Sequence, residues 1–418
     1  MKVLILAETC NPAWASLPSF SYSLANSIAK HVDVVLVTHI RNKEDVSKVL
    51  VHNFKEIIYI DNEYIASPLY KFSQVLKRIG VGGFMTSMAL KYPGNIAFEY
   101  EVYKNLKERI NNKEFDFIHR ISPVSPTVPS PIAKWADTPF IYGPLNGSLP
   151  WPTQFRDEIK KEREFLVHVR DFYKLLPYYK STFTHATKIL AAFKHVEKDI
   201  PTTEHYKIVR FNELGVDTEL YKPNPKKNTT QTQCKFLFVG RLVPYKSAHV
   251  VISAFIESQE LRNKHQLSIV GDGPEREALQ KLIDDNQLSH CIKILGWKTQ
   301  TEVAQYMSES DVFVFPTIRE VGGNVILEAM SAGLPSIVPN YGGPSELIDE
   351  KTGIQIPLAD KQTFLKSYIK GMEQLATNTE LRKKLSNNAR KTALKEHSWP
   401  MKGKQVKEIY QLARTEEK

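Results

Sequence analysis

Short apolar runs alternate with helical stretches along most of this chain, and the alternation restricts the folds that it can adopt. The runs are rich in β-branched and aromatic residues and end at glycine, proline or polar residues, which is typical of buried strands. In the first half they lie at residues 3–7 and around Val35, Tyr59, Ile118, Phe140 and Ile189. Helical patterns such as FSYSLANSIAKH and EYEVYKNLKERI separate most of them. The sequence therefore predicts an α/β fold with parallel sheets that carry helices on both faces.

The length of the chain predicts two domains. Its 418 residues exceed what one typical core holds. Residues 223–233, PNPKKNTTQTQ, are polar and lack apolar periodicity, as interdomain linkers do. We therefore place one domain at residues 1–225 and a second at residues 226–399. Strand–loop–helix units follow one another in the second domain, which predicts a nucleotide-binding sheet of Rossmann type.

The positive net charge of the chain indicates which kinds of partner to expect. The net charge is +10 and the isoelectric point about 9.1, so anionic partners such as nucleotide diphosphates or an anionic membrane surface are expected. Solubility alone would explain this balance equally well. We expect no binding to nucleic acid, because no recognised nucleic-acid motif occurs.

Cysteine usage and hydropathy predict a cytoplasmic protein. Cys10, Cys234 and Cys291 are far apart and form no CxxC or metal-binding spacing, which favours a reducing compartment. The apolar run at residues 3–7 is too short for a signal peptide, and Glu8 interrupts it. No run approaches the roughly 18 apolar residues that a membrane-spanning helix needs. Any membrane contact is therefore expected to be peripheral, at the inner face.

Residues 311–346 combine a strand, a glycine turn and a helix flanked by carboxylates. DVFVFP has the composition of a buried strand, and Gly322 and Gly323 let the backbone turn close to a ligand. Asn324 is a favourable N-cap for the helical run VILEAMSA. Open α/β sheets bind ligands where a strand ends and a helix begins, and Glu320 and Glu328 could accept hydrogen bonds there from sugar hydroxyls. The spacing of these two glutamates alone is more typical of a solvated helix face.

Two cations follow the first strand of the second domain. Gly240 permits a tight turn after FLFV, and Arg241 and Lys246 near a helix N-terminus suit a diphosphate. Gly271 lies in the loop GDGP, which ends the next strand and reads as a mainly structural turn. Taken alone, an arginine and a lysine in a loop are more often only solvated.

Together these motifs resemble the donor site of retaining glycosyltransferases of family 4. The matching strings are G-R-x-x-x-x-K from Gly240, E-x7-E from Glu320, then A-M-x-x-G-x-P and G-G-x-x-E. The resemblance implies the GT-B fold, with two Rossmann-like domains facing a central cleft and a C-terminal helix, residues 400–418, that crosses back to the first domain. It implies a hexosyltransferase of polysaccharide biosynthesis, which moves a sugar from a nucleotide diphosphate sugar to a hydroxyl of a glycan or lipid-linked saccharide with retention of anomeric configuration.

The resemblance also assigns roles to single residues. Arg241 and Lys246 would bind the donor diphosphate, Glu320 would lie near the donor sugar, and these three with His119 are the expected catalytic residues. Glu328 would bind the ribose hydroxyls. The other implied donor-binding residues are Gly240, Gly271, Trp297, Lys298, Gly322, Gly323, Asn324 and Val325. Because two cations can balance the diphosphate and no D-x-D pair occurs, we expect neither a metal nor a cofactor. Family members often carry an aromatic residue where Gly322 stands, so the choice of donor sugar stays open.

Candidate acceptor-side residues lie mainly in the first domain. His119 ends the strand DFIHR at the edge where sites form, although a structural histidine is equally consistent. Ser16 and Ser19 lie in the first loop, where family 4 members usually carry a glycine pair. Asn146 and Trp151 follow the strand PFIYG and suit sugar binding, but an ordered turn with a packed tryptophan is equally consistent.

Residues 62–95 allow two interpretations. Tyr70 and Phe72 lie beside Lys71, Lys77 and Arg78, a combination that fits a helix at a membrane interface. An amphipathic helix with its apolar side on the core is the favoured interpretation.

Two other functions remain compatible with the sequence. A GT-B epimerase would act on a nucleotide sugar without an acceptor. A non-catalytic member would bind a nucleotide sugar or glycan, and the missing glycine pair and Ile121, at a position where the family often has a second histidine, keep it open. An NAD-dependent dehydrogenase is excluded, because ETCNPAWASLP after the first strand is not G-x-G-x-x-G.

Overall fold

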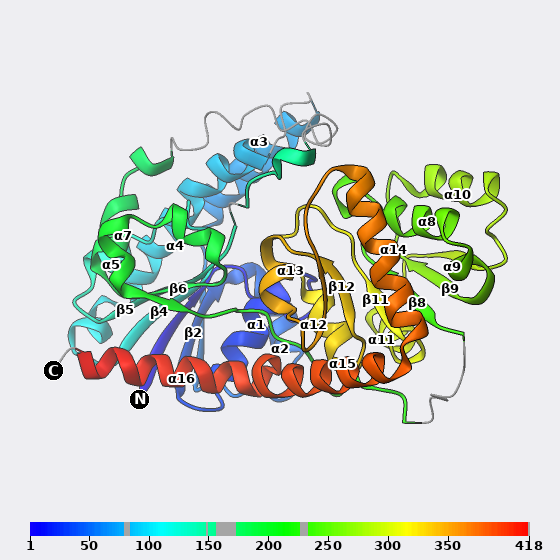
Figure 1. The fold of residues 1–418 in the computed structure, drawn as a ribbon. Helices are drawn as coiled ribbons and strands as arrows, with labels where there is room; N and C mark the ends of the chain where they lie inside the picture. The colour runs from blue at the N-terminus through cyan, green and yellow to red at the C-terminus, as the bar shows by residue number, and fades with distance from the viewer. Residues whose placement is uncertain (79–83, 148, 156–172, 226–232, 417–418) are drawn as a thin grey trace. The chain divides into compact units, whose positions relative to one another are not determined.

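The computed structural model describes residues 1–418 except 79–83, 148, 156–172, 226–232 and 417–418 (Figure 1). The chain divides into two compact units. The first unit comprises Met1–Ser148, Glu164–Glu213 and Trp399–Lys418, and the second comprises Leu149–Arg163 and Leu214–Ser398. The second unit thus takes in a segment around Trp151 that the sequence analysis gave to the first domain. The predicted linker lies largely outside the described residues.

A parallel sheet forms the centre of the first unit. Among the described residues its strand order is β3-β2-β1-β4-β5-β6-β7. The strands are β1 (Lys2–Ala7), β2 (Asp33–His39), β3 (Glu56–Ile60), β4 (Phe117–Ser122), β5 (Phe140–Leu145), β6 (Ala186–Ala191) and β7 (Ile208–Arg210). Every apolar run predicted in this half forms one of these strands. Val3, Leu4 and Ile5 in β1 are fully buried, as expected for a strand with helices on both faces.

Helices cover both faces of this sheet (Figure 1). The helices of the first unit are α1 (Leu17–Ile28), η1 (Ile40–Asn42), α2 (Lys43–Ser47), α3 (Glu63–Arg78), α4 (Phe84–Asn111), α5 (Ile132–Trp135), α7 (Tyr179–His185), η4 (Lys194–Asp199), η5 (Thr202–Lys207) and the C-terminal α16 (Trp399–Glu416). Val406 and Tyr410 of α16 join the core formed by β1 and α1. The C-terminal helix α16 therefore packs into the core of the first unit, together with the N-terminal strand β1 and helix α1.

The second unit holds a parallel sheet whose strand order reverses in the middle. Among the described residues the order is β10-β9-β8-β11-β12-β13. The strands are β8 (Lys235–Val239), β9 (Gln266–Val270), β10 (Ile292–Gly296), β11 (Val312–Val314), β12 (Ser336–Pro339) and β13 (Gly353–Ile356). The reversal lies between β8 and β11. In open α/β sheets ligands bind outside the carboxyl ends of the strands at this point.

Side chains cap some of the helices of the second unit at their N-termini. They are η2 (Thr153–Phe155), η6 (Pro244–Lys246), α8 (Ala248–Glu257), α9 (Gln259–Lys264), α10 (Arg276–Asp285), α11 (Gln300–Glu309), α12 (Asn324–Ser331), α13 (Gly342–Leu347), α14 (Lys361–Thr377), α15 (Thr379–Thr392) and the π-helical turn η7 (Ala393–His397). Thr299 and Glu302 form a capping box at α11. The predicted N-cap of α12 was wrong by one position, because Gly323 with φ of 111° caps this helix and Asn324 is its first residue.

Within the described part of the chain, the structure contains no helix that is both long and apolar enough to span a membrane.

Candidate functional site

A pocket of about 380 Å³ lies where β8 and β11 end, wholly within the second unit. Its walls come from the loop after β8, the start of α11, the end of β11 and the first turns of α12. The pocket therefore occupies the point where the strand order reverses. Its lining residues are Tyr221, Val239, Gly240, Arg241, Tyr245, Lys246, Lys298, Gln300, Val303, Phe315, Glu320, Gly323, Asn324, Val325 and Glu328.

Most of the predicted donor-side residues line this one pocket. Gly240, Arg241, Lys246, Lys298, Glu320, Gly323, Asn324, Val325 and Glu328 do so. Gly271, Trp297 and Gly322 do not, and the Trp297 side chain is 72% exposed. The structure adds Tyr221, Tyr245, Gln300 and Phe315, together with two valines, to the set that the sequence suggested.

The two cations of the pocket, Arg241 and Lys246, differ in whether a carboxylate already balances their charge. The Lys246 ammonium forms an ion pair with Glu320 and lies 4.7 Å from the centre of the Phe315 ring. Arg241 is exposed and makes no ion pair with any residue that the structure describes. One positive charge is therefore open to an anion, whereas the other is already balanced by a carboxylate that the anion would have to displace.

Close backbone packing against α13 positions Glu320. The Gly343 amide donates a hydrogen bond of 3.0 Å to the Glu320 carbonyl. A Cβ atom on Gly343 would lie 2.0 Å from the Gly322 carbonyl oxygen, so only glycine allows this approach. The glycine pair of the G-G-x-x-E motif thus supports the loop that carries Glu320.

A second glycine contact holds the loop that carries Arg241. Gly271 has a φ of 144°, and a Cβ atom on it would lie 1.8 Å from the Gly240 carbonyl oxygen. The Gly240 amide donates to Val270 at 3.0 Å. Gly271 does not line the pocket, but it fixes the backbone of Gly240, which agrees with the structural role suggested for GDGP.

Glu328 is held at the base of the pocket with its charge disfavoured. Asn324 Nδ2 donates to Glu328 Oε1 at 3.3 Å. Burial raises the pKa of Glu328 to about 7, against the opposing hydrogen bonds from Tyr221 and Asn324. Near neutral pH this carboxyl group is therefore partly protonated and can gain from a partner that donates two hydrogen bonds.

Tyr221 reaches the pocket through contacts that no local pattern encodes. Its carbonyl accepts hydrogen bonds from Ser331 Oγ at 2.6 Å and from Arg390 Nη1 at 3.0 Å. The same Arg390 nitrogen donates to the Ser331 carbonyl at 2.6 Å. Burial raises the pKa of the Tyr221 hydroxyl far above its ordinary value, so Tyr221 remains neutral. The residue precedes the linker in sequence and carries no motif, which explains why the sequence analysis missed it.

His119 is a structural histidine in this structure. Its side chain is fully buried. Nδ1 lies 2.6 Å from the Tyr410 hydroxyl, and Nε2 lies 2.7 Å from the Gly143 carbonyl. Burial lowers the pKa of the ring to about 4, so His119 is neutral near pH 7. Its Nε2–H donates a hydrogen bond to the Gly143 carbonyl. Both nitrogens are thus engaged inside the first unit, which favours the structural alternative over direct catalysis.

The other acceptor-side candidates are distributed over both units. Asn146 Nδ2 donates to Glu213 Oε1 at 2.5 Å. Ser16 is exposed at the start of α1 and Ser19 is half-buried within it. Trp151 lies in the second unit, where the Arg319 guanidinium is 4.9 Å from its ring. Asn146 and Trp151 thus match the alternative of an ordered turn followed by a packed tryptophan.

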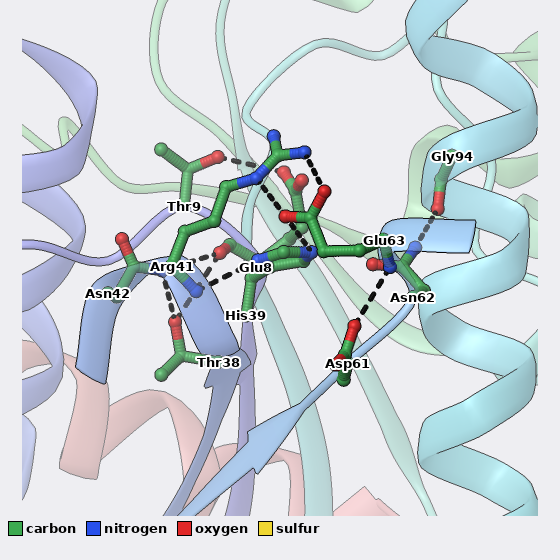
Figure 2. Close-up of polar contacts among 10 residues, drawn as sticks. All are labelled: Glu8, Thr9, Thr38, His39, Arg41, Asn42, Asp61, Asn62, Glu63 and Gly94. Carbon is green, nitrogen blue, oxygen red and sulfur yellow. Dashed lines mark hydrogen bonds and ion pairs between the residues drawn. The ribbon is translucent and has the colours of Figure 1, made fainter. Parts of the chain in front are cut away.

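A polar cluster at the carboxyl edge of the first sheet was not predicted (Figure 2). Arg41 Nη2 donates to Glu63 Oε2 at 2.6 Å, and His39 Nε2 lies 3.8 Å from Glu63 Oε1. Asn42 Nδ2 donates to the Glu8 carbonyl at 2.9 Å. His39 ends β2, and the other residues follow β1, β2 and β3, so each strand contributes one part of the cluster. Polar residues directly after each predicted strand were the signal that could have found it.

Among the residues that the structure describes, no group of three histidine, cysteine, aspartate or glutamate side chains is arranged to hold a metal ion.

A family of known sequences matches part of the second unit. Residues 222–392 match the family described as "Glycosyl transferases group 1". The amylovoran biosynthesis glycosyltransferase AmsK of Erwinia amylovora is 28% identical over 164 residues, which are 37% of this chain and 40% of that protein. The chain spans between 40% and 62% of the length of the first curated relatives that it matches.

Solved structures match almost the whole chain in fold. Sucrose-phosphate synthase of Thermosynechococcus elongatus superposes with a TM-score of 0.65 at 16% identity, over 99% of both chains. HepE of Anabaena in complex with UDP-glucose gives a TM-score of 0.57 at 17% identity, over 98% of this chain and 99% of that one. The predicted fold class is confirmed. The chain has the GT-B fold of two Rossmann-like units, and its residues 222–392 match the family of group 1 glycosyl transferases.

Proposed function

We propose that this protein is a glycosyltransferase that takes its sugar from a nucleotide diphosphate sugar. The observation that carries the proposal is the pocket at the strand-order reversal, where Arg241 and Lys246 face the carboxyl groups of Glu320 and Glu328. Cations in a site suit a diphosphate, and carboxyl groups in the same site suit the hydroxyl groups of a ribose and a sugar.

The relatives support the same donor class. HepE of Anabaena was solved with UDP-glucose, and AmsK is named for amylovoran biosynthesis. We therefore take UDP-glucose as the first donor to test. The acceptor is proposed to be a hydroxyl of a glycan or lipid-linked saccharide, which binds at the carboxyl edge of the first sheet. The cluster of Glu8, His39, Arg41 and Glu63 supplies polar groups there (Figure 2).

The proposed reaction retains anomeric configuration and uses no metal. The bond between the anomeric carbon and the β-phosphate oxygen breaks as the acceptor oxygen attacks from the same face. The acceptor proton passes to the departing phosphate oxygen. Arg241 and Lys246 stabilise the charge that grows on the diphosphate, which is the task that a divalent cation performs in other transferases. Lys246 becomes available to the phosphate when the donor displaces Glu320, and Glu320 is then free to accept a hydrogen bond from the sugar.

Turnover of the donor tests the proposal. Purified protein is incubated with UDP-glucose and candidate saccharides, with and without EDTA, and the products are identified by mass spectrometry and NMR. We expect an α-linked product in both conditions and a loss of at least about a hundredfold in rate for Arg241→Ala, Lys246→Ala and Glu320→Ala. Lys293→Ala is the matched control, because Lys293 is an exposed cation of the same unit outside the pocket.

Four outcomes would contradict parts of this account. Full activity in any of the three pocket variants would remove the assigned roles. A β-linked product would exclude retention, and inhibition by EDTA that added metal reverses would exclude metal independence. An epimerised sugar formed without acceptor would replace the transferase by an epimerase.

A further inference from the structure

Helix α3 of the first unit turns an apolar stripe away from the core. Tyr64, Phe72 and Val75 are 61%, 52% and 51% exposed, and Pro68 and Lys71 between them are exposed too. Their spacing of four, seven, eight and eleven residues from Tyr64 places all five on one face of a helix. We refer to these five residues as the α3 stripe. The solvent-facing side of a surface helix is normally polar. Exposure to solvent alone therefore does not explain the apolar residues of the α3 stripe.

The core side of α3 is already occupied by other apolar residues. Ile65 and Leu69 are half-buried, and α3 packs along α4 (Figure 1). The expected arrangement, with the apolar side of this helix on the core, therefore accounts for only part of its apolar residues. The apolar residues of the α3 stripe do not contact the core in this way.

The charged residues that follow Tyr64 in α3 and in the start of α4 are all basic in sequence. The sequence holds no aspartate or glutamate between Glu63 and Glu99, whereas Lys71, Lys77, Arg78 and Lys91 lie in that interval. Lys71 is the charged member of the α3 stripe. At the other end, the Tyr64 hydroxyl donates to Glu101 Oε1 at 2.9 Å, so an acidic group lies beside the first residue of the stripe and away from Phe72 and Val75.

We propose that the α3 stripe binds the surface of an anionic phospholipid bilayer. Helices that lie in a membrane interface combine aromatic and aliphatic side chains with cations and lack acidic residues on that face. Phe72 and Val75 enter the boundary between head groups and acyl chains. Lys71 lays its aliphatic stem along them and holds its ammonium group at the phosphates.

A second copy of this chain fits the α3 stripe less well. Two copies that paired through this helix would bring the Lys71 cations of both copies into one interface. The net charge of +10 adds to that repulsion. An anionic lipid surface instead complements the same charges. This inference is independent of the nucleotide-sugar pocket, which lies in the other unit.

Flotation of the 418-residue protein with lipid vesicles tests the proposal. We expect binding to vesicles of phosphatidylcholine with phosphatidylglycerol, and much weaker binding to phosphatidylcholine alone. The double variant Phe72→Ser/Val75→Ser should lose at least about tenfold in partition coefficient. The matched control is Leu50→Ser/Val51→Ser, because these two residues are 99% and 78% exposed in the same unit but lie outside α3. The control should bind like the wild type.

A charge variant separates the two parts of the proposed contact. Lys71→Glu should lower binding to the anionic vesicles by roughly fivefold or more for the lost cation and should leave binding to neutral vesicles unchanged. Thermal melting and nucleotide binding of each variant are measured in parallel to confirm that it folds. Absence of binding by the wild type, or wild-type binding by the folded Phe72→Ser/Val75→Ser variant, would overturn the proposal. So would a dimer in analytical ultracentrifugation that this double variant converts to monomer.

Discussion

At the scale of single residues, the pocket is defined by how its charges are balanced before a ligand arrives. Lys246 is paired with Glu320, Arg241 is exposed, and burial raises the pKa of Glu328 to about 7. These residues were predicted as site residues from the sequence, because each belongs to a compact motif. The ion pair between Lys246 and Glu320 was not predicted, since it depends on two loops that are far apart in the chain.

The raised pKa of Glu328 predicts a pH dependence of donor binding. The ionised carboxylate accepts hydrogen bonds from both ribose hydroxyls, so affinity for UDP-glucose should rise by up to about tenfold between about pH 6 and pH 8. The donor itself has no group that titrates in this range. Isothermal titration calorimetry across the range measures the effect, and Glu328→Gln should bind more weakly with a flat profile. An equal slope in the wild type and in Glu328→Gln would contradict this role.

The raised pKa of Glu328 also makes the stability of the folded protein depend on pH, in the opposite direction to donor binding. The unfolded protein ionises Glu328 near the ordinary pKa of 4.5, whereas the folded protein keeps the proton until about pH 7. The contribution of this group to the free energy of unfolding therefore falls as the pH rises between these two values. Binding and stability thus move in opposite directions, which separates the two effects in one set of measurements.

At the scale of secondary-structure elements, glycines hold the two loops of the pocket by close backbone packing. Gly271 lies against Gly240, and Gly343 lies against Gly322. The strands were predicted well from the sequence, because a short β-branched run between turn residues is by itself typical of a buried strand. It could not predict Tyr221, whose place depends on Arg390 and Ser331, or the engagement of His119 by Tyr410 at the far end of the chain.

The packing of α13 predicts that a small substitution will impair the site. Gly343→Ala would place a methyl group against the Gly322 carbonyl and force the loop of Glu320 to move. We expect a loss of at least about tenfold in the turnover rate of the donor, with thermal unfolding still cooperative. Steady-state kinetics and calorimetry measure the two effects.

A suitable control for this substitution is Gly94→Ala in α4 of the first unit. No heavy atom lies within 4 Å of the position that its Cβ would take, so activity should be unchanged. If Gly343→Ala were as active as this control, the glycine pair would not be needed to position Glu320.

At the scale of the whole molecule, each unit builds a parallel sheet of its own, and the donor pocket belongs to the second. The alternation of strands and helices was sufficient to predict this architecture, because it is a local pattern repeated along the chain. The side proposed to bind the acceptor was less predictable. The polar cluster after β1, β2 and β3 (Figure 2) forms only when the parallel strands bring their ends to one edge.

The most direct measurement is calorimetric titration of nucleotide diphosphate sugars, beginning with UDP-glucose, into the wild type, Arg241→Gln, Lys246→Gln and Lys293→Gln. We predict one site per chain, with Kd raised by about tenfold to a hundredfold in each of the first two variants, because each loses a charged contact to phosphate. Lys293→Gln should match the wild type. Binding that is unaffected by the loss of Arg241 and Lys246, or no binding of any nucleotide diphosphate sugar to the folded wild type, would contradict the account.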